Sequence, residues 1–271
     1  TSIKVQRDDA PEGKLHMGWM WVFHSPEKRI VVFEYSPSRG QQAPREFLAG
    51  FQGFLQSDAY AGYNEVAATQ GVEMVGCWAH ARRKFFEARD NDRERAEQML
   101  EWIKQLYRVE NEAYDAKVSP EQRRCLRMEK CVPVLAAIKS WLEAEQPKVL
   151  PKSDIGTAIT YTLKQWTRLN RFVSDGRLQI DNNLVENSIR PVALGRKNWL
   201  FAGSEHAAEC AAVIMTLVAT CKRTGVEPFA YFKDVIARIP ALPPDPDRKL
   251  WKELLPAQWL RAKNSQTLNS S

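Results

Sequence analysis

Hydrophobic and polar positions in the first 79 residues follow the pattern of β-strands. Residues 17–24 (MGWMWVFH) and 29–36 (RIVVFEYS) are rich in aromatic and β-branched residues and flank SPEK, which predicts a two-stranded hairpin. The opening TSIKVQ predicts the end of an earlier strand. GFLQSDAY at 53–60 and VEMVGCWA at 72–79 predict two more strands, with the helix-compatible APREFLAGF ahead of the first. We therefore expect a small sheet in this part of the chain.

From residue 80 to residue 171 the apolar positions recur with the period of amphipathic helices. Apolar side chains between residues 96 and 107 follow the i, i+3, i+4, i+7 spacing. Ser119 predicts the start of a second helix, because a proline follows it and a glutamine stands three residues later, as in a capping box. Pro133 is expected to kink that helix, and a third helix is predicted over 155–169. No segment here has the pattern of a strand, so an all-helical insertion is expected.

After residue 172 the pattern is mixed but mostly helical. EHAAECAAVIMTLVATCKRTG is apolar nearly all round, which predicts a buried helix that ends at Gly225. EPFAYFKDVIARIP predicts a shorter amphipathic helix that ends before Pro240. The remaining residues, 241–271, have the composition of a proline-rich segment and a flexible tail.

Composition indicates a globular protein with a substantial core: 44% of the 271 residues are hydrophobic, including nine Trp and eleven Phe. The 39 Lys and Arg exceed the 33 Asp and Glu by a net +6, which permits a nucleic-acid partner without requiring one. The five cysteines form no Cys-x-x-Cys pair, so we expect buried thiols in a reduced, cytoplasmic protein rather than disulfides or a zinc site. We see no signal peptide, and the longest apolar run is too short to span a bilayer.

Asp58 is the first candidate metal ligand. It stands after the apolar GFL of a predicted strand, within LQSDAYAGYN. One interpretation is a turn, because Asp, Gly and Tyr commonly end strands and Asp readily caps the next segment. The other is a metal-binding carboxylate, because side chains at the end of a strand project from a rigid sheet edge.

Glu186 is the second candidate and lies in an unusual stretch, DGRLQIDNNLVENSIRPVALGRKNWLFAG at 175–203, among Asn182, Asn183 and Asn187. Asn183 followed three residues later by Glu186 matches a capping box, in which the Glu side chain reaches back to the cap amide. That interpretation leaves the other two amides and the cations after them unexplained. The alternative makes Glu186 a metal ligand, with the amides supporting it or contacting a DNA backbone.

Two basic clusters adjoin these carboxylates in the sequence, HARRKFF at 80–86 and RPVALGRKNW at 190–199. Such clusters are commonly solvated faces, but their position here favours contacts with phosphate. An aromatic ring beside these cations either stacks on unpaired bases or belongs to the core. The scattered histidines, and the lack of a glycine-rich phosphate loop or a nucleophile elbow, leave zinc, nucleotide and hydrolase-triad chemistry unsupported. The candidate DNA-binding residues are His80, Arg82, Arg83, Asn182, Asn183, Arg190, Arg196, Lys197 and Trp199.

Three segments, GFLQSDAYAGYN, CWAHARRKFFEA and DGRLQIDNNLVENSIRPVALGRKNWLFAGS, together resemble the transposases of the insertion sequence 66 family. The similarity extends over most of the chain, to about residue 240. It implies an α/β fold of the Asp-Asp-Glu class: a ribonuclease-H-like mixed sheet interrupted by an all-helical insertion, with further C-terminal helices. Residues 1–79 and 172–240 would then form the catalytic domain, 80–171 the insertion, and 241–271 the proline-rich segment and flexible tail.

The resemblance also implies an activity, namely metal-dependent DNA strand cleavage and strand transfer in the transposition of an insertion sequence. Asp58 would be the second and Glu186 the third of three carboxylates that hold two Mg²⁺ (or Mn²⁺) ions. Arg190, Arg196 and Lys197 would hold phosphate near the site. The implied partner is DNA, both transposon ends and target, bound by a homo-oligomer that is associated with the nucleoid in the bacterial cytoplasm.

The first carboxylate of the site is not evident in the sequence. Family members have Asp-Glu-Thr where this sequence begins with Thr1 and Ser2, so we expect the first Asp one or two residues upstream. Among Asp8, Asp9 and Glu12, Asp9 is the alternative. As it stands the chain would be an incomplete enzyme. The competing hypotheses are a non-catalytic DNA-binding or assembly relic of a transposase, and a helical scaffold without a nucleic-acid role.

Overall fold

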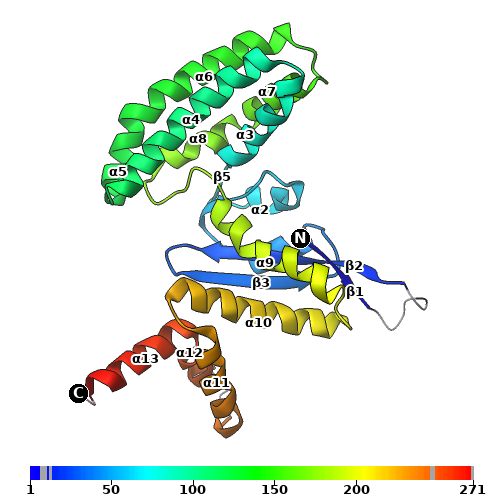
Figure 1. Cartoon of the computed structure of the whole chain (residues 1–271), viewed down its shortest axis with the longest axis vertical. Coiled ribbons are helices and arrows are strands. Elements are labelled where there is room, and N and C mark those ends of the chain that lie inside the picture. Colours follow the sequence, from blue (N-terminus) through cyan, green and yellow to red (C-terminus); the bar gives the residue numbers. More distant parts are fainter. Residues whose placement is uncertain (7–10, 12–13, 245–247, 270–271) are drawn as a thin grey trace. The chain divides into compact units, whose positions relative to one another are not determined.

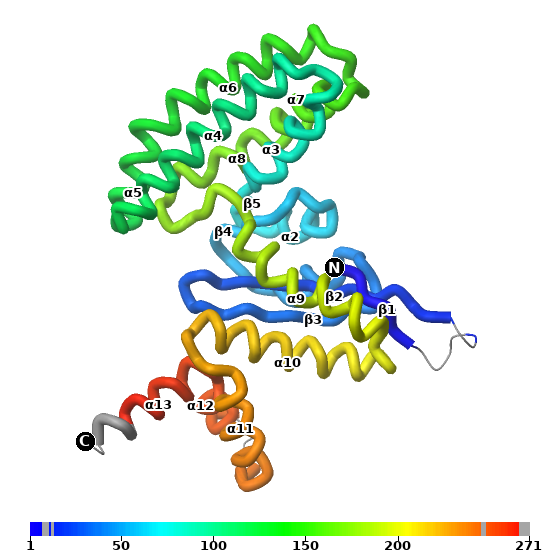
Figure 2. Tube along the Cα trace, in the orientation of Figure 1, coloured from blue at the N-terminus to red at the C-terminus, as the bar shows by residue number. Residues whose placement is uncertain are grey.

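The computed structural model describes residues 1–6, 11, 14–244 and 248–269, and the chain divides into two compact units (Figures 1 and 2). Unit 1 comprises Thr1–Ala43 and Leu184–Ser271, and unit 2 comprises Pro44–Asn183. Unit 1 therefore combines the two ends of the chain, and unit 2 is inserted between them. The helical insertion predicted from residue 80 is part of this larger inserted unit.

Unit 1 contains a three-stranded antiparallel sheet, whose strands are β1 (Ser2–Val5), β2 (His16–Ser25) and β3 (Ile30–Ser36) in that order. The register pairs Ile3 with Gly18 and Val22 with Phe33. The predicted hairpin, with its turn at SPEK, and the predicted earlier strand are both confirmed. Gly18 is needed in β2, because a Cβ there would lie 2.5 Å from the ring of Tyr35.

Helices from the C-terminal third complete unit 1, and α10 runs alongside β3 (Figure 1). The hydroxyl oxygens of Thr216 and Thr220 accept hydrogen bonds from the backbone N–H groups of Phe33 (2.8 Å) and Val31 (3.2 Å). These bonds satisfy donors that the edge of β3 would otherwise expose. The helices are α9 (Asn183–Trp199, which begins at the last residue of unit 2), α10 (Glu205–Thr224), α11 (Pro228–Arg238), α12 (Lys249–Glu253) and α13 (Pro256–Asn269), with a 3₁₀ turn η6 (Ile239–Ala241).

Residues 241–271, expected to be a proline-rich segment and a flexible tail, contain two helices that were not predicted, α12 and α13. Leu254 and Trp259 are 4% and 5% exposed and share a hydrophobic cluster with Tyr231. The Trp259 indole N–H also donates to Asp234 Oδ2 at 2.7 Å. Burial of these side chains against α11 stabilises the helices of this segment.

Unit 2 begins with two short parallel strands, β4 (Gly53–Gln56) and β5 (Val72–Val75). Their register pairs Gln56 with Val75, and the Ser57 N–H continues the ladder to Val75 O at 3.1 Å. Both strands were predicted, although each is shorter than its apolar segment. A helix precedes β4 and short helical segments lie between the two strands: α1 (Gln42–Phe47), η1 (Ala61–Tyr63) and α2 (Asn64–Ala67).

The rest of unit 2 is helical and encloses the largest hydrophobic cluster of the described residues. Trp78, Phe85, Ile103 and Leu142 are all 0% exposed within it. The predicted helices of this region are confirmed. They are α3 (Trp78–Glu87), α4 (Arg93–Asp115), α5 (Pro120–Leu126), α6 (Val132–Glu145), α7 (Asp154–Lys164) and α8 (Trp166–Asn170), with 3₁₀ turns η2 (Ala88–Asp90), η4 (Gln146–Lys148) and η5 (Arg171–Ser174).

The second predicted helix of this region starts as its sequence requires. Ser119 and Gln122 form the capping box, with the Gln122 N–H donating to Ser119 Oγ and the Ser119 N–H donating to Gln122 Oε1. One π-helical turn, η3 (Arg127–Cys131), joins α5 to α6 just before Pro133, where a kink was expected. A proline cannot donate the usual hydrogen bond, and π turns are one way in which helices accommodate such a position.

The mixed α/β class is confirmed. In the part of the chain that the structure describes, no helix is both long enough and apolar enough to cross a membrane.

Candidate functional site

Asp58 stands directly after β4, at the carboxyl end of a parallel strand pair. Its Oδ1 accepts the Tyr60 N–H at 3.2 Å, and Ala59 between them has a left-handed φ of 62°. The predicted turn therefore exists. The same turn holds the Asp58 carboxylate at the end of a strand, as the metal-site hypothesis requires. A non-glycine residue at positive φ is strained, and such strain is enriched at functional sites.

The first half of the 175–203 stretch lies beside this strand end, within unit 2. Gln56 Nε2 donates to Gly76 O at 3.0 Å and to Gln179 O at 2.8 Å. The Trp78 N–H donates to Ile180 O at 3.1 Å. Residues 179–180 are thus bonded to the end of β4 and the start of α3, which brings the first half of the 175–203 stretch close to the strand that precedes Asp58.

Asn182 comes after this tied segment and is 6% exposed. Its N–H donates to Cys77 Sγ at 3.4 Å. Burial raises the pKa of Cys77 to about 11, so the thiol is protonated at neutral pH and acts as packing rather than as a nucleophile. This burial favours the hypothesis that Asn182 supports the candidate site over the hypothesis that it contacts a DNA backbone.

A fully buried arginine holds the segment that leads to Asn182. Arg127, 0% exposed, donates from Nη1 to Phe172 O (2.6 Å) and Asp175 O (2.9 Å), and from Nη2 to Leu178 O (2.8 Å). Its charge is balanced by Glu110, which accepts from Nε at 2.7 Å and from Nη2 at 2.9 Å. The bidentate pair, together with three backbone carbonyls, satisfies all five guanidinium donors.

The charge state of Glu110 is determined by this pairing. Burial by itself would raise the pKa of Glu110, but the guanidinium groups of Arg127 and Arg123 outweigh that effect and lower it. Arg123 adds further contacts to the same segment, donating to Gly176 O and Gln179 Oε1 at 3.3 Å each. A side chain at Gly176 would not fit, because a Cβ there would lie 1.8 Å from Pro120 O.

Asp181 and Tyr107 are part of this arrangement and were missed in the sequence. The Tyr107 hydroxyl donates to Asp181 Oδ2 at 2.7 Å, and the Asn183 N–H donates to Asp181 Oδ1 at 3.0 Å. Asp181 is thus the residue that accepts from the first amide of α9, a role that the capping-box interpretation gave to the Glu186 side chain. Asp181 stands inside the quoted IDNN and could have been singled out there, whereas Tyr107 carries no local signal.

Glu186 lies on the first turns of α9 in unit 1 and is exposed. With 3.6 residues per turn, Glu186, Arg190 and Lys197 fall on one face of the helix, and all three are exposed. Two of the predicted phosphate-binding cations therefore share a face with the predicted metal ligand.

Arg196 lies on the neighbouring face of α9 and is half-buried against β1. Its Nη1 donates to Ser2 O at 2.6 Å, Ser2 Oγ at 3.0 Å and Thr1 Oγ1 at 3.2 Å. Val192, one turn earlier, is 0% exposed in a cluster with Ile3. Within unit 1 the first strand and the Glu186 helix are therefore packed together, and Arg196 holds the start of the strand.

The remaining predicted DNA-binding residues lie on surfaces of the two units. Arg82 and Arg83 are exposed on α3, whereas Nδ1 of His80 on the same helix is buried without a hydrogen-bond partner among the described residues. Trp199 is 37% exposed at the end of α9, so its ring is accessible for stacking. Asn183 is exposed but bonded to Asp181.

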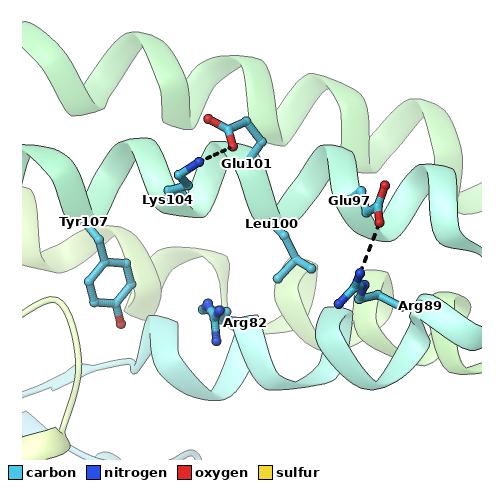
Figure 3. Close-up of a pocket in the computed structure, with 7 residues that line it drawn as sticks. All are labelled: Arg82, Arg89, Glu97, Leu100, Glu101, Lys104 and Tyr107. Atoms are coloured by element: carbon cyan, nitrogen blue, oxygen red, sulfur yellow. Dashed lines mark hydrogen bonds and ion pairs between the residues drawn. The ribbon is translucent and has the colours of Figure 1, made fainter.

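An open groove of about 460 Å³ lies between α3 and α4 in unit 2 (Figure 3). Arg89 and Lys104 in the groove are paired with Glu97 and Glu101, at 3.2 Å and 3.1 Å. Arg82 lines the same groove and makes no ion pair with any described residue, so it is the cation there best able to take an anion. The lining residues are Arg82, Arg89, Glu97, Leu100, Glu101, Lys104 and Tyr107.

If Asp58 and Glu186 bind the same metal ions, ordinary metal–oxygen lengths predict that their carboxylates lie about 4–8 Å apart. The two residues belong to different units, so this distance stays a prediction. In the described part of the chain no group of three or more His, Cys, Asp or Glu side chains is arranged to hold a metal ion. Asp8, Asp9 and Glu12, considered for the first carboxylate, lie outside the described residues.

Comparison with known proteins identifies the family. The model of the family described as "Transposase IS66 family" matches residues 1–210, and that of the "IS66 C-terminal element" matches residues 216–257. The chain belongs to the IS66 transposase family. This family match contains the Asp58 strand end, the helical unit and the Glu186 helix.

Three relatives from Sinorhizobium fredii are similar to this chain. The uncharacterized protein y4hP is 36% identical over 97% of this chain and 50% of its own length. The uncharacterized proteins y4qI and y4jD are each 34% identical, over 84% and 79% of this chain and 44% and 43% of their own lengths. The chain thus spans about half the length of these curated relatives. No solved structure matches it.

Proposed function

We propose that this chain of the IS66 transposase family is the catalytic part of an Asp-Asp-Glu transposase, which cuts DNA strands and transfers them during transposition of an insertion sequence. One observation carries the proposal: the family match extends over residues 1–210, in which a carboxylate comes after a parallel strand and another begins a helix rich in exposed cations. Asp58 and Glu186 are the carboxylates that we assign to catalysis.

The fold that we propose is ribonuclease-H-like. In support, the chain carries three antiparallel strands, β1–β3, then two parallel strands, β4 and β5, and finally the helix α9, with the helical part of unit 2 between β5 and α9. Within unit 1, the helix that carries Glu186 packs against β1, the first strand of this order.

The donor set fits divalent metal binding. Asp58 and Glu186 offer carboxylate oxygens, the hard ligands that Mg²⁺ and Mn²⁺ prefer. Bound Mg²⁺ or Mn²⁺ would supply charge stabilisation for attacking and leaving oxygens at phosphorus. The protein's own contribution would be to orient DNA, with Arg190 and Lys197 contacting phosphates beside Glu186.

The test uses the protein together with any residues that its coding frame places upstream of Thr1, here called the longer protein. Glu186→Gln and Asp58→Asn should each lower Mg²⁺-dependent cleavage of labelled transposon-end DNA by about 10²–10³-fold, because loss of a ligand removes several kcal/mol of charge stabilisation. Both should also weaken Mn²⁺ binding, measured by titration. Glu209→Gln, at an exposed position on α10, is the control and should change neither.

Two outcomes would count against the proposal. Unchanged cleavage and Mn²⁺ affinity in Glu186→Gln would show that the site assignment is wrong. DNA binding with a steep salt dependence, but no metal-dependent cleavage by the longer protein, would support the alternative of a non-catalytic DNA-binding or assembly module.

A further inference from the structure

The start of the Glu186 helix is connected to the helical part of unit 2 by a short chain of hydrogen bonds. Tyr107 on α4 donates its hydroxyl to Asp181 Oδ2 at 2.7 Å. Asp181 in turn accepts the Asn183 N–H on Oδ1 at 3.0 Å and the Asn183 Nδ2 on Oδ2 at 2.8 Å. Asn183 is the first residue of α9, three residues before Glu186.

Tyr107 is well placed to hold Asp181 still. Its neighbours on α4, Ile103 and Leu106, are both 0% exposed in the main cluster of unit 2, so the helix that carries the hydroxyl is anchored. Burial and the nearby Asp181 carboxylate raise the pKa of Tyr107, so the hydroxyl keeps its proton and remains a donor at neutral and alkaline pH.

The backbone that leads to Asp181 is already held on its other side. Arg127 binds the carbonyls of Phe172, Asp175 and Leu178, and Trp78 binds that of Ile180. Residues 181–183, where the helix starts, follow this held segment, and the Asn182 N–H is bonded to Cys77 Sγ at 3.4 Å. A simple helix cap needs only Asp181. A tyrosine from 74 residues earlier in the chain adds a connection to the helical insertion that capping does not require.

We propose that Tyr107 is a positioning residue for Glu186: through Asp181 and Asn183, the helical insertion orders the first turn of the helix that carries the catalytic carboxylate. The inference rests on the proposed function for the role of Glu186, but the ordering of α9 is a property of the protein itself. It assigns to the insertion a direct part in preparing the site.

Amide hydrogen exchange of the protein without DNA or metal tests the ordering. The amides of residues 187–189 donate to the carbonyls of residues 183–185, so loss of order in the first turn exposes them to exchange. Tyr107→Phe removes one charge-assisted hydrogen bond and should speed their exchange about tenfold. Tyr114→Phe is the matched control, because Tyr114 lies on the same helix and is 82% exposed; it should leave exchange unchanged.

A double-mutant cycle separates this route from a general loss of stability. In an Asp181→Ala background, Tyr107→Phe should cause no further acceleration at residues 187–189, because its acceptor is already absent. Core amides of α4 and α6 should exchange as in the wild type in Tyr107→Phe. Additive effects in the cycle, or equal acceleration throughout unit 2, would overturn the proposal.

The consequence for the reaction is tested in the longer protein. Tyr107→Phe should lower kcat for DNA cleavage about tenfold and leave KM for DNA unchanged, because it disturbs the order around Glu186 and not a DNA contact. In a Glu186→Gln background it should have no further effect, and a further loss would overturn the positioning role. If the wild type cleaves no DNA, the proposed function fails, whereas the exchange experiment still decides whether Tyr107 orders α9.

Discussion

Replacement of Glu110 by Gln is expected to lower the stability of unit 2 more than most conservative substitutions would. The substitution keeps the shape of the side chain but removes its charge, while Arg127 stays fully buried at 0% exposure. Removing one partner of a buried ion pair costs about 3–5 kcal/mol, because the remaining charge is left without compensation. The Gln carbonyl can still accept one hydrogen bond, so we expect the lower end, about 3 kcal/mol.

Urea unfolding at pH 7 measures this loss. With a slope of about 2 kcal/mol per molar urea, the midpoint for unit 2 should fall by about 1.5 M. Glu112→Gln is the matched control on the same helix, because the side chain of Glu112 is 50% exposed and its pair with Lys130 is a surface pair. Its free energy of unfolding should change by less than about 1 kcal/mol.

A sharper test is how the stability difference between wild type and Glu110→Gln depends on pH. The pKa of Glu110 is lowered from its ordinary 4.5 in the folded protein, so its carboxylate contributes stability that is fully present above about pH 4.5 and is lost as the pH falls through the folded-state value. Wild type and Glu110→Gln should therefore converge in stability at acidic pH. A difference below about 1 kcal/mol at pH 7, or one that does not shrink on acidification, would refute the reasoning.

Two further predictions concern packing and burial. Gly176→Ala should destabilise unit 2 by about 1–3 kcal/mol in urea unfolding, because the new Cβ would lie 1.8 Å from Pro120 O, whereas Gly203→Ala, with no atom within 4 Å, should be neutral. At pH 8 a thiol reagent should label the two exposed cysteines rapidly and the buried ones only after unfolding, as mass spectrometry would show; rapid native labelling of a buried cysteine would contradict this. The exposed cysteines are Cys125 and Cys210, and the buried ones, whose pKa burial raises to about 11, 12 and 11, are Cys77, Cys131 and Cys221.

Local patterns were sufficient for the elements of the chain. The hairpin around SPEK, the capping box from Ser119 to Gln122 and the helix that ends at Gly225 were all predicted, because each depends on neighbours within a few residues. The helices α12 and α13 were not, and their packing depends on distant contacts such as that of Trp259 with α11.

The residue types of the candidate site could be predicted from the sequence, but the residues that hold its backbone in place could not. The placement of Asp58 after a strand and of Glu186 on a helix with Arg190 could be read from spacing. Nothing in the sequence distinguishes the buried Arg127 from an exposed arginine, since its burial depends on the carbonyls of a segment some 45 residues away.

The sequence by itself thus determined most of the elements and the residue types of the candidate site, because backbone propensity, capping and hydrophobic period act over short distances. Only the tertiary structure decided that Arg196 holds β1, that Arg127 holds the segment before Asp181, and that Tyr107 donates to Asp181 just before α9. These contacts join residues far apart in the chain. They exist because buried charges and backbone groups must find partners once the core excludes water.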